Sequence, residues 1–393
     1  MAPAVTPAAA AIVGAALSDV GRTDDRSVFE LHWQAASRAV ADAGLTRNDI
    51  DGVMTVGTGV LPPVEVAEYL GLRPIWLDST GVGGSTWEVF LEHAVAAITA
   101  KQAEVILIVY GSTARSDLKK GLRPANLALS SRGPSQFDAP WGHTLIAKYA
   151  MTARRHMHQY GTTIEQLADV AVAARHNASL NPEAMYREPL TVDEVLAGPM
   201  IADPFTKLQC CIRSDGGGAV VVTSAERARQ LQREPVWVLG TGSVSSHTTM
   251  SEWRDFTVSP AVVSGRRAFA AAGLTPNDVD LCQFYDAFTI LLPMTFEALG
   301  FCAPGEGGPY VAGDRLKVGG AMPTNTDGGG LSACHPGMRG VFLLVEAVRQ
   351  LRSEAGDRQV PHARVACVNG TGGWFSSAST ALLGSNAAFG VSA

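Results

Sequence analysis

The sequence predicts an α/β protein built from two similar halves. The segment Arg38-Ala-Val-Ala-Asp-Ala-Gly-Leu-Thr-Arg-Asn-Asp-Ile-Asp51 recurs as Arg267-Ala-Phe-Ala-Ala-Ala-Gly-Leu-Thr-Pro-Asn-Asp-Val-Asp280. Around each copy, short apolar runs alternate with alanine-rich stretches of helical spacing, which is the pattern of strands alternating with helices. A repeat of two long units in 393 residues argues against a solenoid and favours two fused domains of one fold. We therefore expect an active site at the seam between the halves.

The first half is predicted to form strands at 11–16, 52–56 and 105–109 and helices at 29–44 and 87–101. Gly44 ends its helix, because glycine adopts the left-handed conformation of a helix C-terminus. The second half repeats this order with strands at 236–239, 281–284 and 364–368 and helices at 260–273 and 340–353. Gly273 again marks the end of a helix. The all-apolar run 105–109 suits a strand that is buried on both faces of a sheet.

These elements predict three regions in the chain. Residues 1–117 form the first part of the N-terminal half, and residues 234–393 form the C-terminal half. Between them, residues 118–233 form an insertion that contains a helix at 144–159 and then returns to the N-terminal half. Long insertions with polar turns often cover a binding site, so we expect a substrate lid.

Composition excludes several functional classes. Apolar residues make up 46% of the chain and charged residues 17%, and the net charge is -6, which argues against binding to nucleic acid or to an anionic membrane. No apolar stretch has the roughly 18 residues that a membrane span needs, and the N-terminus lacks the positive region of a secretory leader. A cytoplasmic protein is expected. The six cysteines lack paired spacing, so we expect no metal site and no disulfides.

Four motifs carry a family resemblance. They are Asn325-Thr-Asp-Gly-Gly-Gly-Leu-Ser-Ala-Cys-His-Pro-Gly-Met-Arg-Gly340, the run Tyr285-Asp-Ala-Phe288 at a strand end, and the insertion segments 153–161 and 214–224. They resemble the thiolase superfamily, in its branch of sterol-carrier and lipid-transfer-like thiolases. The resemblance implies a duplicated five-layered αβαβα fold with two mixed sheets and a lid in the first half. It also implies a CoA thioester as substrate and no bound cofactor.

The main departure from this family is the absence of its nucleophile. Thiolases place a reactive cysteine at the start of the helix near Trp87, and the matching position here is Gly81. Covalent acyl transfer through that thiol is therefore excluded. Gly81, Gly83, Gly84 and Ser85 are predicted to leave a roomy pocket with free N–H groups for an oxyanion. Alternatively, these glycines only permit close helix packing.

Other candidate residues follow from the same comparison. Tyr285 matches the tyrosine of a Tyr-Asp-x-Phe segment that thiolase-like aldolases of steroid side-chain degradation use to cleave a carbon–carbon bond. His335 matches the thiolase histidine that stabilises a thioester enolate, and Cys334 and Cys367 are further candidates for proton transfer. The remaining predicted substrate or oxyanion contacts are Asp286, Asn325, Gly370 and Gly372. Alternatively, Tyr285 is a core aromatic residue and His335 belongs to a surface loop.

The other cysteines and histidines carry weaker predictions. Cys210, Cys211, Cys282 and Cys302 are expected to be small buried hydrophobic residues. His156 and His158, beside Arg154 and Arg155, are candidates for binding CoA phosphates or simply part of a solvated cationic face. His143 is a candidate for the pocket mouth.

Three functions are compatible with these residues. The first is a retro-aldol lyase that cleaves a 3-hydroxyacyl-CoA to a ketone or aldehyde and a short acyl-CoA by acid/base catalysis. The second is an acyltransferase whose thiol is Cys334 or Cys367, and the third is a non-catalytic subunit that binds CoA esters. The resemblance also implies a homodimer formed through the edge strand 75–78. It further implies a small partner protein with an OB-fold and a zinc ribbon.

Overall fold

The computed structural model describes residues 8–121, 133–141 and 144–389. The strands are β1 Ala10–Leu17, β2 Gly52–Met54, β3 Trp76–Asp78, β4 Val105–Ser112, β5 Met200–Ala202, β6 Phe205–Thr206, β7 Gly216–Ser224, β8 Val236–Ser245, β9 Leu281–Phe284, β10 Val365–Gly372 and β11 Ser377–Gly384. The helices are α1 Val28–Asp42, α2 Pro62–Tyr69, α3 Thr86–Thr99, α4 Ala114–Lys119, α5 Leu145–Tyr160, α6 Ile164–Ser179, α7 Val192–Leu196, α8 Ala225–Ala228, α9 Ala261–Ala272, α10 Leu291–Leu299, α11 Gly307–Val311 and α12 Gly340–Leu351.

Nine strands form one mixed sheet in the order β3-β2-β4-β7-β1-β8-β11-β10-β9. The first five belong to the first half of the chain and the last four to the second half. Two residue pairs, Ala11 with Trp237 and Ile12 with Val236, join β1 to β8 in antiparallel orientation. The two sheets expected from the sequence are therefore joined edge to edge, because β1 and β8 run side by side where the halves meet.

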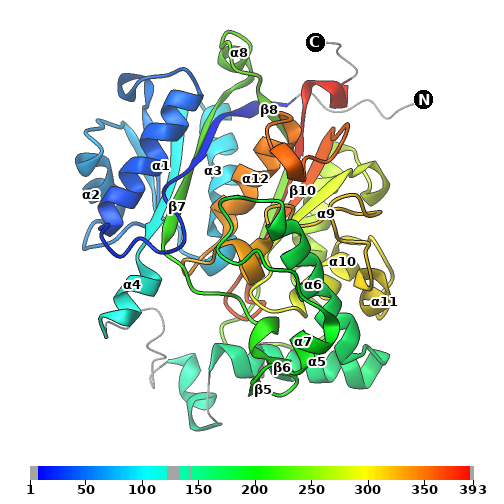
Figure 1. Ribbon diagram of the computed structural model, residues 1–393. Helices are drawn as coiled ribbons and strands as arrows, with labels where there is room; N and C mark the ends of the chain where they lie inside the picture. The colour runs from blue at the N-terminus through cyan, green and yellow to red at the C-terminus, as the bar shows by residue number, and fades with distance from the viewer. Residues whose placement is uncertain (1–7, 122–132, 142–143, 390–393) are drawn as a thin grey trace.

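Helices cover both outer faces and fill the space between the two parts of the sheet (Figure 1). Helix α1 contacts β1, β4 and β7 on one outer side, and α9 contacts β8 and β11 on the other. Helices α3 and α12 lie between them, and each contacts strands of both halves. This gives the five layers αβαβα. One large core surrounds the central helices, and a second lies under the outer helices.

The duplication extends to individual hydrogen bonds. After α1, the carboxylate of Asp49 accepts the N–H of Thr46 at 2.9 Å, and after α9 that of Asp278 accepts the N–H of Thr275 at 2.8 Å. Asp51 and Asp280 then bind the first residues of β4 and β10, respectively. In both halves, the aspartate two residues after the repeated Thr-x-Asn-Asp turn thus fixes the start of an inner strand.

All ten strands and helices predicted in the two halves are present, with ends shifted by a few residues. The helix predicted at 144–159 is α5. Strands β7 and β11 were not predicted, because glycine, alanine and serine dominate parts of both and give no alternating pattern. Segment 118–233 contains α5, α6 and α7 before it returns to the sheet as β7.

Candidate active site

Tyr285 lies directly after β9 and is held there by its neighbours. Its N–H donates to the carbonyl oxygen of Asn369 in β10 at 2.9 Å. The side chain of Asn325 both accepts from the N–H and donates to the carbonyl oxygen of Phe284, each at 2.8 Å. Both polar atoms of the Asn325 amide are thus engaged by the backbone. The prediction that Asn325 contacts substrate is corrected to a role in fixing the end of β9.

Asp286 holds the turn that carries the candidate histidine. Its carboxylate accepts the N–H groups of Gly330 at 2.7 Å and Leu331 at 3.3 Å, at the start of a π-helical turn over Gly329–Ala333. Burial raises the pKa of Asp286 to about 6, and the nearby Arg339 guanidinium opposes this shift. Asp286 is fully buried and used by this turn, so its predicted contact with substrate is replaced by a structural one.

Arg339 is a residue that the sequence did not single out. It is fully buried, and one of its nitrogens donates to both carboxylate oxygens of Asp327, at 2.6 and 2.5 Å. Another nitrogen donates to the carbonyl oxygen of Cys334 at 2.8 Å. This ion pair, made through one guanidinium nitrogen, ties the two ends of the segment 327–339 together and so fixes the loop that contains His335. The only sequence signal was its place in the family motif.

The ring of His335 packs edge-to-face against the ring of Tyr285. The ring centroids are 5.5 Å apart and the rings are nearly perpendicular. Ser214 accepts the backbone N–H of His335 at 2.9 Å, so the end of the insertion helps to position the histidine. The Nε2 atom is buried and has no hydrogen-bond partner among the described residues. Burial, followed by the charge of Arg339, lowers the pKa of His335 to about 4, so the ring is neutral at physiological pH.

Tyr285 is also a protonated group in this structure. Only 6% of the residue is exposed, and burial raises the pKa of its phenol well above the ordinary value. The ring covers the start of α3 so closely that a β-carbon added at Gly84 would lie 2.3 Å from it. Tyr285, from the second half, therefore packs against the residues just before α3. In thiolases the corresponding helix start carries the nucleophilic cysteine, which this chain lacks. His335 is buried, so the alternative of a surface histidine does not describe it, whereas Tyr285 does lie within the central core.

The glycines of the 81–85 loop have two different environments. A β-carbon at Gly83 would lie 2.8 Å from the N atom of Gly373, and one at Gly372 would lie 1.8 Å from the carbonyl oxygen of Val82. These positions, like Gly84, are glycine because two backbones approach closely. Gly81 is exposed, and a β-carbon added there would have its nearest neighbour, a side-chain carbon of Val56, 4.0 Å away. Unlike Gly83, Gly84 and Gly372, this position is therefore not crowded by other atoms.

Ser85 does not offer its hydroxyl group to a substrate. Its Oγ lies 2.8 Å from the Oγ of Ser377 in β11, and both hydroxyl groups are close to the carbonyl oxygen of Val82. A 3-10 turn, Gly83–Ser85, precedes α3, and within it the backbone N–H of Thr86 donates to the carbonyl oxygen of Gly83. The N–H of Val82 donates to Oγ1 of Thr86 at 3.0 Å. What this loop offers to a developing negative charge is the positive end of the helix dipole.

Gly370 makes room for another residue that the sequence analysis missed. A β-carbon there would lie 2.1 Å from Oε2 of Glu88, which is fully buried in the first turn of α3. From the sequence, Glu88 looks like an ordinary acidic residue at a helix N-terminus. Its burial follows only from the contact of α3 with both halves of the sheet.

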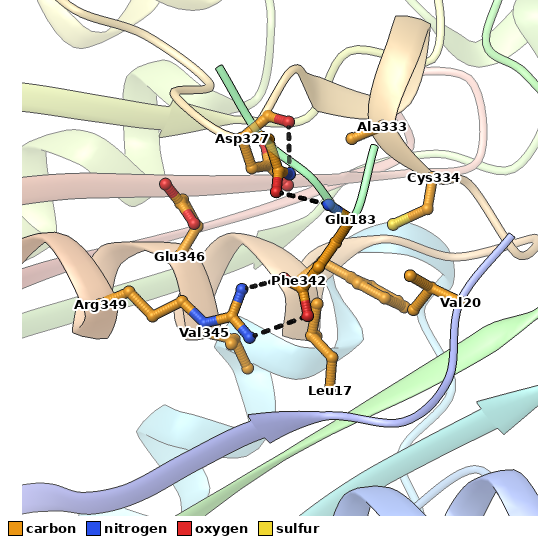
Figure 2. A pocket seen from close by; sticks show the side chains of 11 residues that line it. Leu17, Val20, Glu183, Asp327, Ala333, Cys334, Phe342, Val345, Glu346 and Arg349 are labelled. Carbon is orange, nitrogen blue, oxygen red and sulfur yellow. Dashed lines mark hydrogen bonds and ion pairs between the residues drawn. The ribbon is translucent and has the colours of Figure 1, made fainter. Parts of the chain in front are cut away.

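Cys334 is next to His335 in the chain, but its side chain lines a separate small cavity. Figure 2 shows its side chain at a small pocket, which Leu17, Val20 and Phe342 also line. The pocket volume is about 10 Å³, room for roughly one water molecule. Tyr285 and His335 do not line it. Burial raises the pKa of the Cys334 thiol to about 12, so the reactive thiolate is scarce.

Cys367 is separated from the other candidates by the sheet. It lies in β10 opposite Cys282 of β9 and belongs to the outer core, whereas Tyr285 belongs to the central core. Burial raises the pKa of its thiol as well. The prediction that Cys367 transfers a proton is corrected, because successive side chains of a strand point to opposite faces. Cys282 is buried, and Cys210, Cys211 and Cys302 are partly buried.

The histidines of α5 are also placed by the structure. His156 is fully buried, with Nε2 3.1 Å from the Glu297 carboxylate and Nδ1 2.8 Å from the Thr162 hydroxyl group. It is not available to bind CoA phosphates and instead connects α5 to α10. His158 is exposed, and Arg154 pairs with Asp203. His143 lies outside the described residues.

Metal sites and membrane spans are both absent from the part of the chain that the structure describes. Within residues 8–121, 133–141 and 144–389, no cluster of three or more His, Cys, Asp or Glu residues could hold a metal ion. In the same ranges, no helix combines the length and apolar character of a membrane span.

Comparison with known proteins places this site in a family. Residues 242–385 match the model of the thiolase C-terminal domain-like family. A steroid side-chain-cleaving aldolase of Thermomonospora curvata is 35% identical over 94% of this chain and 96% of its own. An acetyl-CoA acetyltransferase of Methanothermobacter thermautotrophicus is 33% identical over 92% of this chain and 96% of its own. The solved Ltp2-ChsH2(DUF35) aldolase superposes with a TM-score of 0.88 at 32% identity, covering 97% of this chain and 98% of that chain.

Identity of this extent along nearly the whole chain shows that the protein belongs to the thiolase superfamily. Its relatives include both acyltransferases and aldolases, and acyl transfer in this superfamily needs a thiol where this chain has Gly81. The protein is therefore one of the thiolase-like aldolases, enzymes that break a carbon–carbon bond.

Proposed function

We propose that the protein cleaves the C2–C3 bond of a 3-hydroxyacyl-CoA with Tyr285 and His335 as its acid/base pair. The observation that supports this most is the buried His335 Nε2 without a partner among the described residues, facing a protonated Tyr285 at 5.5 Å between ring centroids. A phenol both donates and accepts a proton through one oxygen, and a neutral imidazole accepts one.

The proton of the substrate hydroxyl group passes to the Tyr285 oxygen while the phenol proton passes to Nε2 of His335. The C2–C3 bond then breaks, a ketone or aldehyde forms, and the electron pair moves to the thioester as an enolate. Return of the proton from the imidazolium to C2 gives the short acyl-CoA. This order agrees with the raised pKa of Tyr285, because the phenolate never has to form alone.

The enolate oxygen lies at the N-terminal end of α3, where the helix dipole favours negative charge. The open space at Gly81 receives the thioester. The names of the aldolase relatives support a steroid side chain as the acyl group, and the reaction needs no bound cofactor. We place the enzyme in the cytoplasm.

The test is cleavage of a panel of branched and steroidal 3-hydroxyacyl-CoAs, followed by mass spectrometry of the short acyl-CoA. Tyr285→Phe should abolish release while CoA-ester binding persists, since the variant loses only the hydroxyl group. Tyr310→Phe, at a tyrosine that packs against Phe296 in the outer core, is the matched control. Full activity in Tyr285→Phe would refute the mechanism. Covalent acylation of Cys334 during turnover would instead support an acyltransferase.

A homodimer through β3 is the proposed assembly. This strand is at the edge of the nine-stranded sheet, and Ile75, directly before it in the chain, is 80% exposed. Val60 and Leu61, which precede α2, are 89% and 60% exposed. An unpaired edge with apolar neighbours favours pairing with a second copy. The related Ltp2-ChsH2(DUF35) aldolase has two components in its name, which supports a partner protein here, with an OB-fold and zinc ribbon expected from the family resemblance. Co-purification and sedimentation velocity test both associations.

A further inference from the structure

A carboxyl group that the proposed reaction does not use lies behind the 81–85 loop. Glu88 is completely buried, and neither of its carboxyl oxygens has a hydrogen-bond partner among the residues described. An ionised carboxylate in such a place is costly, so the group keeps its proton. Burial raises the pKa of Glu88 to about 8. Near neutral pH the side chain is therefore a neutral carboxylic acid.

Two glycines of the second half make the space for this group. A β-carbon at Gly370 would lie 2.1 Å from Oε2 of Glu88, and one at Gly340 would lie 2.6 Å from the same atom. The same β-carbon position at Gly340 is also 2.6 Å from the carbonyl oxygen of Gly84. Gly84 is the residue against which the Tyr285 ring packs. The carboxyl group thus lies about one helical turn, roughly 6 Å, behind the residue that contacts Tyr285.

No opposite charge compensates Glu88 among the described residues. The ionisable groups on the surrounding elements are Glu92 and His93 on α3, Arg339, Glu346 and Arg349 at α12, Tyr110 on β4, Cys282 on β9, Cys367 on β10 and Tyr285 after β9. His93 pairs with Asp78, and Arg349 pairs with Glu183. Arg339 is engaged by Asp327, Glu346 by Arg358, and Cys367 belongs to the outer core. Only burial and its own backbone shift the pKa of Glu88. Its protonation is thus controlled by desolvation.

We propose that Glu88 is a positioning residue that must stay neutral for carbon–carbon cleavage, an inference that rests on the proposed function. The reaction places negative charge on the thioester oxygen at the N-terminus of the same helix. A carboxylate in the first turn of that helix repels this charge, and at a separation on the order of 6 Å with an effective dielectric constant near 20 the repulsion would slow the reaction about 100-fold. Activity therefore falls as Glu88 ionises.

The first test compares the pH dependence of kcat/KM for wild type, Glu88→Gln and Glu92→Gln. Wild type and Glu92→Gln should lose activity above about pH 8, whereas Glu88→Gln should remain active to about one pH unit higher or more. Glu92 is the matched control because it lies one turn further along α3. An unchanged alkaline limit in Glu88→Gln would overturn the proposal. If that variant does not fold, Glu88→Met serves the same comparison.

The second test does not depend on turnover. Infrared difference spectra between about pH 7 and about pH 9 should show the carbonyl stretch of a protonated carboxyl group, present in wild type and absent in Glu88→Gln. Absence of this band in wild type would show that Glu88 does not lose its proton between these pH values, and so would refute the proposal that its ionisation limits activity there. Wild type that has the band but cleaves no substrate at any pH would refute the proposed function instead.

Discussion

Replacing Glu88 with glutamine should stabilise the protein, and increasingly so as the pH rises from about 5 to about 8. The pKa of Glu88 is raised from 4.5 to about 8 by burial. Above pH 4.5 the unfolded chain releases this proton while the folded protein keeps it, so folding becomes less favourable as pH rises. The penalty grows by about 1.4 kcal/mol per pH unit, to about 3 kcal/mol at pH 7, and stops growing above about pH 8.

The assay is urea unfolding followed by circular dichroism at several pH values in this window. The midpoint of Glu88→Gln should move above that of wild type by an amount that increases with pH, since the amide does not titrate. Glu226→Gln, at an exposed position, controls for the loss of a carboxylate. A difference between Glu88→Gln and wild type that stays constant from about pH 5 to about pH 8 would refute the reasoning, because it would show that Glu88 does not hold its proton on folding.

Three further substitutions have defined outcomes. Gly84→Ala should lower kcat on the order of 100-fold with little change in substrate binding, because the alanine β-carbon would displace the Tyr285 ring. An unchanged kcat would contradict the close packing of this ring, 2.3 Å from the β-carbon position at Gly84. Arg339→Met should destabilise the fold by about 3–5 kcal/mol in urea unfolding, because Asp327 is left buried without its partner; a smaller effect would mean that water reaches the carboxylate. Ile75→Asp should give a monomer in sedimentation velocity, and a persistent dimer would place the interface elsewhere.

The fold was predictable because the chain repeats itself. The Thr-x-Asn-Asp turns and the glycines after α1 and α9 set the start and end of matching elements, and these signals are local. The joining of the two sheets was not predictable, since it depends on the pairing of β1 with β8, strands far apart in the sequence. Strand β11 was missed for another reason: its small residues have no periodic pattern.

The site was predictable only in part. Tyr285 and His335 lie within motifs at a strand end and a turn, and the structure places their rings against each other. The sequence does not show how polar atoms are used, so Asn325 looked available although the backbone of Phe284 occupies both of its polar atoms. Glu88 was missed because its burial is decided by glycines from distant elements.

The pairing of β1 with β8 determines what a break in the backbone between the two halves would do. A cut within residues 229–235, between α8 and β8, would separate the two halves and expose a long strand edge on each fragment. Helix α3 would leave with one fragment and Tyr285 with the other. Neither fragment alone could then hold a substrate between its proton donor and its anion-binding helix. The two exposed edges would favour re-association of the fragments with each other, and that re-association would restore the complete site.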